Sequence, residues 1–268
     1  MSRIPAKFAA LKEQGRTALI PFVTAGDPEP GVTVDLMHQM VISGADLIEL
    51  GVPFSDPMAD GPAIQKANER ALVHDISLHQ VMDMVAEFRQ KDDTTPIILM
   101  GYLNPIEVLG YADFAKEAQA KGVDGVITVD IPPEEGSDYV QILRDHEVDP
   151  IFLLAPTSNE ARIETVTRAA SGFVYYVSLK GVTGAATLVV DTVRDKLDEI
   201  RAKTDLPLGV GFGIKDAAMA KAMSAFADAV VVGSALVNRV EANAGNKSAI
   251  LEQVGAILSE MRQAMDEK

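Results

Sequence analysis

The sequence predicts an α/β protein, a (β/α)8 TIM barrel built as a single domain over residues 1–268. Short apolar runs rich in β-branched residues alternate with amphipathic stretches, which is the pattern of β-α units that form a parallel sheet. There are eight such runs, and 268 residues is a usual length for one barrel of this kind. The segments richest in glycine, proline and carboxylates follow the runs directly, where barrels carry their active sites. An open doubly wound sheet shows the same alternation, but the number of runs and the chain length favour the barrel.

The expected strands are short and apolar, and helices with one apolar face are expected between them. The strands cover Ala18–Thr24, Leu47–Leu50, Ile97–Gly101, Gly125–Val129, Ile151–Leu154, Phe173–Ser178, Leu208–Gly211 and Ala229–Gly233. The helices cover Val32–Ile42, Ala63–Val73, Leu78–Arg89, Tyr111–Ala120, Ser137–His146, Glu160–Ala169, Val190–Lys203 and Lys215–Ala225. Pro62 suits the first turn of its helix, where a missing N–H costs nothing.

Two amphipathic stripes lie outside this repeat. Ile4, Phe8 and Leu11 share one helical face, which predicts an extra N-terminal helix that caps the bottom of the barrel. A similar stripe near the C-terminus predicts a helix that packs on the barrel; it comprises Leu251, Val254, Leu258, Met261 and Met265.

Composition narrows the class of protein. Cysteine is absent, which excludes disulfides, thiolate zinc sites and cysteine nucleophiles and fits a reducing cytoplasm. The four histidines lack metal-binding spacing, so no metal site is expected. Lys and Arg total 24 against 39 Asp and Glu, and the net charge of −15 would repel nucleic acid and anionic membranes. Neither a signal peptide nor an apolar run of roughly 18–20 residues is found, so we expect a cytoplasmic protein.

Glu49 is the first candidate catalytic residue. Strand alternation places Leu47, Glu49 and Gly51 on one face of an apolar strand. A carboxylate there either faces a polar cavity or is costly to bury. At the top of a barrel it would face the substrate pocket, where desolvation raises its pKa toward neutrality and suits it to take and give a proton. The alternative is an edge carboxylate or a structural salt bridge.

Asp60 is the second candidate. It follows Glu49 by eleven positions, in a loop with three prolines that is bent at Gly61. Prolines restrict the conformations of the loop and can hold a second carboxylate near the first. Two carboxylates in different surroundings can take different protonation states and different tasks. Asp56 shares the loop, and we expect it to form a turn or to contact another chain.

Three later loops predict a phosphate site. They are Gly181–Ala185 after the sixth strand, Gly211–Ile214 after the seventh and Gly233–Ala235 after the eighth. In barrels, the loops after strands seven and eight often bind phosphate through backbone N–H groups and a helix N-terminus. Such local donors would hold an anion against the negative field of the whole protein. Each glycine pair alone could equally serve an ordinary turn.

Taken together, these segments resemble one known family, the tryptophan synthase alpha chains. The resemblance is carried by Glu49–Gln65 (E-L-G-V-P-F-S-D-P-M-A-D-G-P-A-I-Q), Pro21–Pro28, Met100–Pro105, Gly181–Gly184, Gly211–Ile214 and Gly233–Ala235. It runs from near residue 18 to near residue 235. A chance match to all six segments is negligible, although any one of them alone remains a hypothesis.

The resemblance implies an aldol-type cleavage of indole-3-glycerol phosphate to indole and glyceraldehyde 3-phosphate. It assigns Glu49 as the acid/base that protonates C3 of the indole ring and takes the proton from the side-chain hydroxyl. It assigns Asp60 to the indole N–H and to the cation formed once C3 is protonated. Tyr175, at the end of the sixth strand, resembles a family residue near the reacting atoms.

The same resemblance implies the binding residues and the partner. Phe22, Tyr102 and Phe212 would line the indole pocket, and Gly184, Gly213, Gly233 and Ser234 would bind phosphate. Thr183 would approach Asp60 when a lid closes and excludes water. No cofactor is expected in this chain, because pyridoxal phosphate belongs to a beta subunit that receives the indole in an α2β2 assembly. Leu179 departs from the arginine that some members carry there, which puts the contacts of the lid in question and leaves the reaction unchanged.

Two other functions compete with this interpretation. Lys180 follows the sixth strand and could form a Schiff base in an aldolase, if desolvation lowered its pKa. That mechanism leaves Glu49 and Asp60 unexplained. A barrel that only binds a phosphorylated ligand, as a regulatory subunit, is the other alternative. Two carboxylates at an anion site argue against it, because they would weaken binding of the anion.

Overall fold

The computed structural model describes residues 1–178, 186–211 and 213–267. Within them, eight parallel strands pair in chain order, and β8 closes on β1 with Ala18 opposite Ala229. This closure rules out the open sheet. The strands are β1 (Ala18–Thr24), β2 (Ile48–Gly51), β3 (Ile97–Gly101), β4 (Gly125–Thr128), β5 (Asp149–Leu154), β6 (Val174–Val177), β7 (Leu208–Gly211) and β8 (Ala229–Val232).

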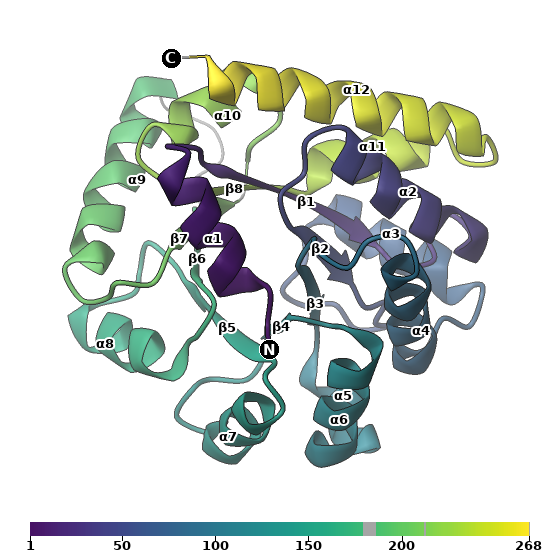
Figure 1. Ribbon diagram of the computed structural model, residues 1–268, viewed down its shortest axis with the longest axis horizontal. Helices are drawn as coiled ribbons and strands as arrows, with labels where there is room; N and C mark the ends of the chain where they lie inside the picture. The colour runs from purple at the N-terminus through teal and green to yellow at the C-terminus, as the bar shows by residue number, and fades with distance from the viewer. Residues whose placement is uncertain (179–185, 212, 268) are drawn as a thin grey trace.

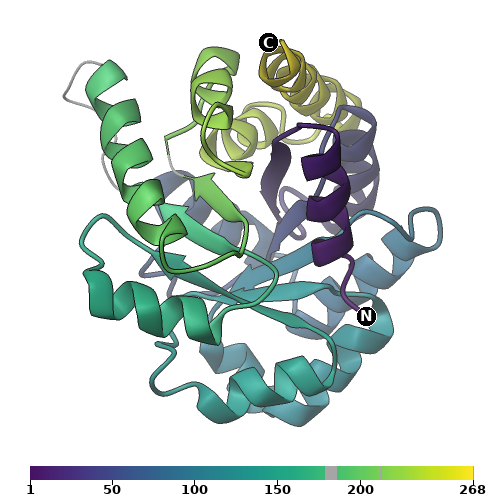
Figure 2. The ribbon, with the colours of Figure 1, turned by 60° about the vertical axis from the view of Figure 1, so that its left-hand side comes forward.

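Helices surround the barrel on its outside (Figures 1 and 2). They are α1 (Ile4–Glu13), α2 (Pro30–Ile42), α3 (Pro62–Leu72), α4 (Leu78–Arg89), α5 (Leu103–Leu109), α6 (Tyr111–Lys121), α7 (Ser137–Asp145), α8 (Glu160–Ala169), α9 (Ala186–Arg201), α10 (Ala217–Ser224), α11 (Ser234–Ala242) and α12 (Lys247–Asp266). The predicted fold class is confirmed, and each expected strand is present with ends that differ by at most two residues.

Two helices were not expected from the sequence. α5 has seven residues, too few to show a periodic apolar face, and it contains Pro105. α11 follows β8 directly and buries only Leu236, Val237 and Val240. The sequence therefore predicted the glycine segment that precedes α11 but not the helix itself.

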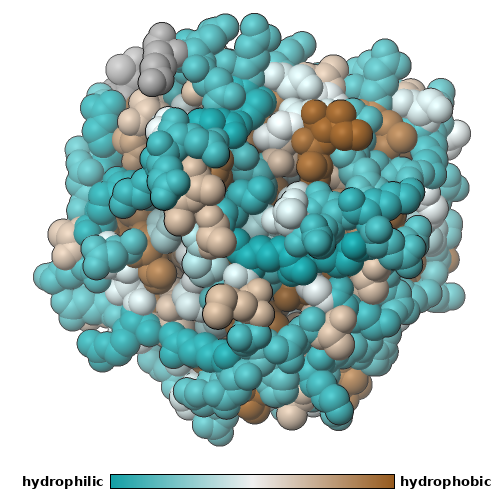
Figure 3. Space-filling view, in the orientation of Figure 1, coloured by the Kyte–Doolittle hydropathy of each residue, from teal (hydrophilic) through white to brown (hydrophobic). Residues whose placement is uncertain are grey.

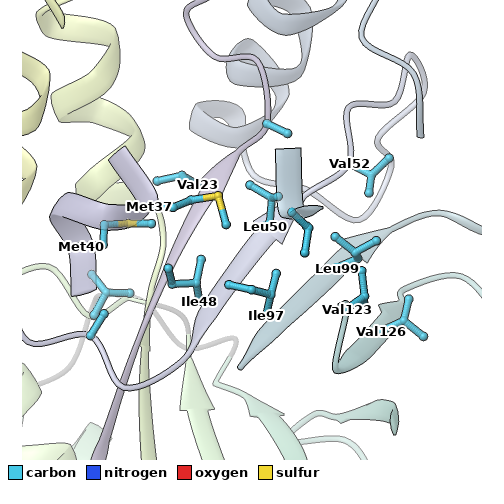
Figure 4. Packing of buried hydrophobic residues seen from close by; sticks show 14 of the residues in the cluster. Val23, Met37, Met40, Ile48, Leu50, Val52, Ile97, Leu99, Val123 and Val126 are labelled. Carbon is cyan, nitrogen blue, oxygen red and sulfur yellow. The ribbon is translucent and has the colours of Figure 1, made fainter. Parts of the chain in front are cut away.

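The apolar residues form an inner and an outer layer. Side chains of alternate strand residues fill the barrel interior, among them Ile20, Ile98 and Ile127. The other residues of each strand pack outward under the helices, as Ile48 and Leu50 do beside Met37 of α2 in Figure 4. Because this alternation runs through β2, Glu49 belongs to the inward set together with Gly51.

α1 caps the lower end of the barrel, as predicted. Its buried residues Ile4, Phe8 and Leu11 join the interior cluster. The rings of Phe8 and Phe173 lie 5.7 Å apart. Figure 1 shows α1 lying across the strands at this end. The opposite end, where the strands terminate, is therefore the end that can admit a substrate.

Three aspartates brace the lower end. Each precedes a strand, accepts a backbone N–H from the start of the preceding strand, and pairs with an arginine. The sets are Asp46 with Leu19 and Arg262, Asp124 with Ile97 and Arg89, and Asp228 with Leu208 and Arg201. These carboxylates have structural partners, which distinguishes them from Glu49.

The outer surface is largely polar on the face that Figure 3 shows. Hydrophobic residues lie on this face in separate small areas. No helix in the described part of the chain is long and apolar enough to cross a membrane.

Candidate active site

Glu49 lies inside the upper barrel with only 1% of its surface exposed. In the register of the sheet, Glu49 lies opposite Phe22 of β1 and Ile98 of β3. Its Oε2 accepts no hydrogen bond, and no cation pairs with its carboxylate, among the described residues. Burial, and secondarily the charge of Asp60, raise the pKa of Glu49 to about 8. A carboxyl group in this setting is protonated at neutral pH and can still release its proton.

Tyr175, on β6, lies in the same interior. Burial, and secondarily the charge of Glu49, raise the pKa of Tyr175 well above its ordinary value, so its phenol keeps its proton. Its ring packs over Gly211 of β7, where an added Cβ would lie 2.1 Å from Tyr175 Oη. Gly211 is therefore required for Tyr175 to occupy this place. The structure brings Tyr175 into the surroundings of Glu49, as the resemblance implies.

Asp60 is held by donors from two directions. Tyr102 Oη donates to Asp60 Oδ2 at 3.2 Å, and Asn68 Nδ2 donates to the same oxygen at 3.3 Å. Gln65 Nε2 donates to the backbone carbonyl of Asp60 at 2.8 Å. Burial raises the pKa of Asp60, while the hydrogen bonds from Tyr102 and Asn68 oppose that rise by stabilising the charged form. The two carboxyl groups thus occupy different surroundings.

Asn68 was missed by the sequence reasoning. It lies on the buried face of α3 between Ala67 and Ala71 and is 3% exposed. A buried asparagine needs a hydrogen-bond partner, so its position on an otherwise apolar helix face was the available signal.

Tyr102 also organises the loop that carries Asp60. Its Oη accepts a hydrogen bond from the Ala59 N–H at 3.0 Å. Its ring stacks on Phe54, with centroids 4.8 Å apart. Tyr102 was predicted to line the pocket, and the structure makes it a hydrogen-bond donor to Asp60 as well.

A pocket opens beside Asp60, and its wall is largely apolar. Its lining residues are Phe22, Gly51, Val52, Asp60, Ile64, Asn68, Met100, Gly101, Tyr102 and Val129. An added Cβ on Gly51 would lie 2.7 Å from the Phe22 ring, and one on Gly233 would lie 3.7 Å from it. A largely apolar wall with one carboxylate suits an aromatic ring that carries an N–H group. Ile64, Met100 and Val129 were not anticipated as lining residues.

The candidate phosphate site lies at the start of α11. This helix begins at Ser234 after Gly233. The N–H groups of Leu236 and Val237 donate to the Gly233 carbonyl oxygen, which leaves those of Ser234 and Ala235 without an acceptor among the described residues. Gly213 has φ +82°, and its Cβ position is open. The helix dipole favours an anion at this point, and the Ser234 hydroxyl can add a donor. Leu179, Lys180, Thr183, Gly184 and Phe212 lie outside the described residues.

Burial of Glu49 predicts a pH-dependent stability. Its pKa is about 8 in the folded protein against an ordinary 4.5, so the folded state binds more protons between these values. The stability contributed by this group is fully present below the unfolded pKa and is lost as pH rises through the folded pKa. We expect wild type to lose about 4 kcal/mol more unfolding free energy than Glu49→Gln between about pH 5 and pH 9. Urea denaturation of both proteins at the two pH values measures this, and equal losses would contradict a buried, titrating Glu49.

Comparisons with known proteins cover nearly the whole chain. The family model described as tryptophan synthase alpha chain matches residues 8–266. The tryptophan synthase alpha chain of Thioalkalivibrio sulfidiphilus is 65% identical over 266 residues, covering 99% of this chain and 100% of that protein. The crystal structure of tryptophan synthase subunit alpha from Legionella pneumophila is 46% identical, with a TM-score of 0.94 and 100% of both chains covered. A tryptophan synthase structure from M. tuberculosis is 31% identical, with a TM-score of 0.88 and 99% of both chains covered.

Proposed function

This chain belongs to the tryptophan synthase alpha chain family, and we propose that Glu49 is the acid/base of its reaction and that Asp60 stabilises the cation formed on the indole ring. The chain is a lyase that cleaves indole-3-glycerol phosphate to indole and glyceraldehyde 3-phosphate for tryptophan synthesis. It uses no cofactor of its own, and its partner is the beta chain, which holds pyridoxal phosphate. An α2β2 assembly, action in the cytoplasm and a single domain over residues 1–268 belong to the proposal, and family membership supports them.

The reaction needs an electron sink before its C–C bond can break. Protonated Glu49 gives its proton to C3 of the indole ring, which leaves a cation shared with the ring nitrogen. The bond from C3 to the side chain then breaks, and its electron pair returns to the ring. The hydroxyl on the released carbon becomes the aldehyde oxygen, and its proton goes back to the Glu49 carboxylate. The protons balance, and no oxidant or reductant is needed.

Asp60 accepts the indole N–H and stabilises the cation while it exists. The observation that carries the proposal is the difference between the two carboxyl groups: Glu49 is buried and its Oε2 has no hydrogen-bond partner among the described residues, whereas Asp60 receives two side-chain donors. The first environment favours the neutral acid and the second favours the charged carboxylate. Tyr175 lies in the same barrel interior, where the charge of Glu49 adds to the rise of its pKa, and we assign it to the reacting centre.

The remaining residues bind the substrate. Phe22 and Tyr102 line the indole pocket, and Gly213, Gly233 and Ser234 bind the phosphate. Phe212, Gly184 and Thr183 keep the binding and lid roles that the resemblance implies.

The proposal is tested by indole release from indole-3-glycerol phosphate, with and without the beta subunit. Slow release that the partner accelerates is the expected result. Borohydride added during turnover should trap no adduct. A substrate adduct on Lys180 would replace this mechanism with Schiff-base chemistry.

Gly213→Ala is expected to weaken phosphate binding. An alanine is strained at φ +82°, and its methyl group would enter the open space at Gly213, in the loop after β7. We expect KM to rise about tenfold while kcat changes less than about twofold, because the phosphate does not react. Gly245→Ala is the matched control: Gly245 has φ +84°, also lies in open space, and follows the other end of α11. Equal effects of the two substitutions would show that backbone strain, not phosphate contact, is responsible.

A further inference from the structure

Arg70 has no part in the reaction described above, yet its side chain joins three elements that build the site. It lies in the last turn of α3. Its Nε and Nη2 donate to the two carboxylate oxygens of Asp27, at 2.6 and 2.8 Å. Its Nη1 lies 3.3 Å from Glu241 Oε1, in the last turn of α11. One guanidinium therefore ties together α3, α11 and the loop after β1.

Of the two ion pairs that Arg70 makes, the one with Asp27 is the more buried. The side chain of Asp27 is 2% exposed and that of Arg70 is 22% exposed. Burial raises the pKa of Asp27, and Arg70 opposes the rise. A planar guanidinium that makes two parallel hydrogen bonds fixes orientation as well as distance, which a lysine cannot do. The loop after β1, which carries Asp27, is also anchored to α2, since the Gly26 N–H donates to Thr33 Oγ1 at 2.9 Å.

The two helices that Arg70 joins both begin at the active site. α3 starts at Pro62, two residues after Asp60, and its residues Gln65 and Asn68 hold Asp60 by hydrogen bonds. α11 starts at Ser234, in the candidate phosphate site. The two helices contact each other, and both contact β1. Ala67 of α3 and Val237 of α11 pack in one cluster with Phe22 of the indole pocket.

An α-helix behaves as a rod over two or three turns, because each residue adds a fixed rise of about 1.5 Å. A contact that stops α11 from sliding along α3 at their far ends therefore also sets the offset of their near ends. One near end carries the phosphate donors, and the other holds the carboxylate that receives the indole N–H. Their separation must match the length of the substrate.

We propose that Arg70 is a positioning residue that sets the distance between Asp60 and the start of α11, so that both ends of one substrate molecule are engaged at once. This inference rests on the proposed function. A ligand that touches only one end does not sense the distance. A ligand that touches both ends binds tightly only if the second contact needs no further movement.

The test compares ligands that occupy one end with the substrate that occupies both. Inorganic phosphate and indole serve as single-ended inhibitors, and indole-3-glycerol phosphate is the double-ended substrate. For purified wild type, Arg70→Lys and Arg70→Met, kcat/KM is measured with the beta subunit present, and the inhibition constants are measured on the chain alone, because the beta subunit takes up indole. For both variants we expect kcat/KM to fall about tenfold or more, while the inhibition constants of phosphate and indole change less than about twofold.

Two further variants separate positioning from general damage. The double variant Asp27→Asn/Arg70→Met removes the pair without leaving a buried unpaired charge, and we expect it to regain thermal stability but not kcat/KM. Lys66→Met is the matched control, because Lys66 lies one turn earlier on α3 and reaches Glu241 only at 3.8 Å from an exposed position. We expect Lys66→Met to behave as wild type.

Each possible result either supports or overturns the positioning role of Arg70. Loss of kcat/KM with unchanged inhibition constants supports positioning by Arg70. Parallel weakening of phosphate binding would place Arg70 in the phosphate site instead and overturn the inference, as would a kcat/KM restored by the double variant. Unchanged kcat/KM in Arg70→Met would also overturn it. A failure of the proposed function would show separately, as a wild type that releases no indole.

Discussion

Glu49→Gln is expected to lower kcat for indole release by about a thousandfold, within the range of roughly 10²–10⁴ for loss of a general acid or base. Glutamine has nearly the same shape and stays neutral in the buried site, but it cannot give a proton to C3 or accept one from the hydroxyl. The rate of indole formation in a single turnover measures this loss of catalytic rate directly. The inhibition constant of inorganic phosphate provides the control and should not change, because the phosphate site lies on other strands.

The same assignment predicts the pH dependence of wild-type catalysis. The protonated form of Glu49 starts the reaction, and its pKa is about 8. We therefore expect kcat/KM to fall as pH rises through about 8, and Glu49→Gln to lack this limb in whatever activity remains. A Glu49→Gln protein that keeps wild-type activity would show that Glu49 is not the acid/base of the reaction, whereas a wild type that releases no indole would favour the regulatory alternative.

Asp60→Asn is expected to lower kcat by about 10²–10³-fold, the usual cost of losing one preorganised electrostatic contact to a transition state. Asparagine can still accept a hydrogen bond from the indole N–H, but it carries no charge to stabilise the cation. Because the cation exists only after C3 is protonated, the loss should fall on kcat more than on KM. Steady-state indole release at saturating substrate measures it.

Asp56→Asn is the matched control for Asp60→Asn. Asp56 lies in the same loop and is exposed, and its Oδ2 accepts a hydrogen bond from Ser55 Oγ at 2.6 Å. We expect Asp56→Asn to leave indole release by the chain alone within about twofold of wild type, as for most surface substitutions. A fall in Asp56→Asn as deep as in Asp60→Asn would point to the structure of the loop rather than to the charge of Asp60.

Features that depend on neighbouring residues in the chain were predictable. Alternation along Leu47–Gly51 placed Glu49 on the inward face, and the structure puts it there. The helical stripe of Ile4, Phe8 and Leu11 predicted the cap at the lower end, and those three residues are buried in it. Such patterns repeat every 2 or 3.6 residues, so a short window contains them.

Features that depend on distant residues were not predictable in the same way. Arg70 and Asp27 are 43 positions apart, and their pair exists only because α3 lies against β1. Tyr102 is 42 positions from Asp60, and no pattern of neighbouring residues predicts the hydrogen bond between them. α11 was missed because its first residues, Ser234 and Ala235, belong to the glycine segment that we interpreted as a loop.

The sequence by itself determined the number and order of the strands, the face on which Glu49 lies and, through six matching segments, the family. The tertiary structure decided what each carboxyl group can do. Whether Glu49 holds a proton at neutral pH depends on how completely β1, β3 and β6 exclude water from it. Whether Asp60 is charged depends on donors that reach it from α3 and from Tyr102. Desolvation and hydrogen bonding are sums over all groups around an atom, and only the folded chain brings those groups together.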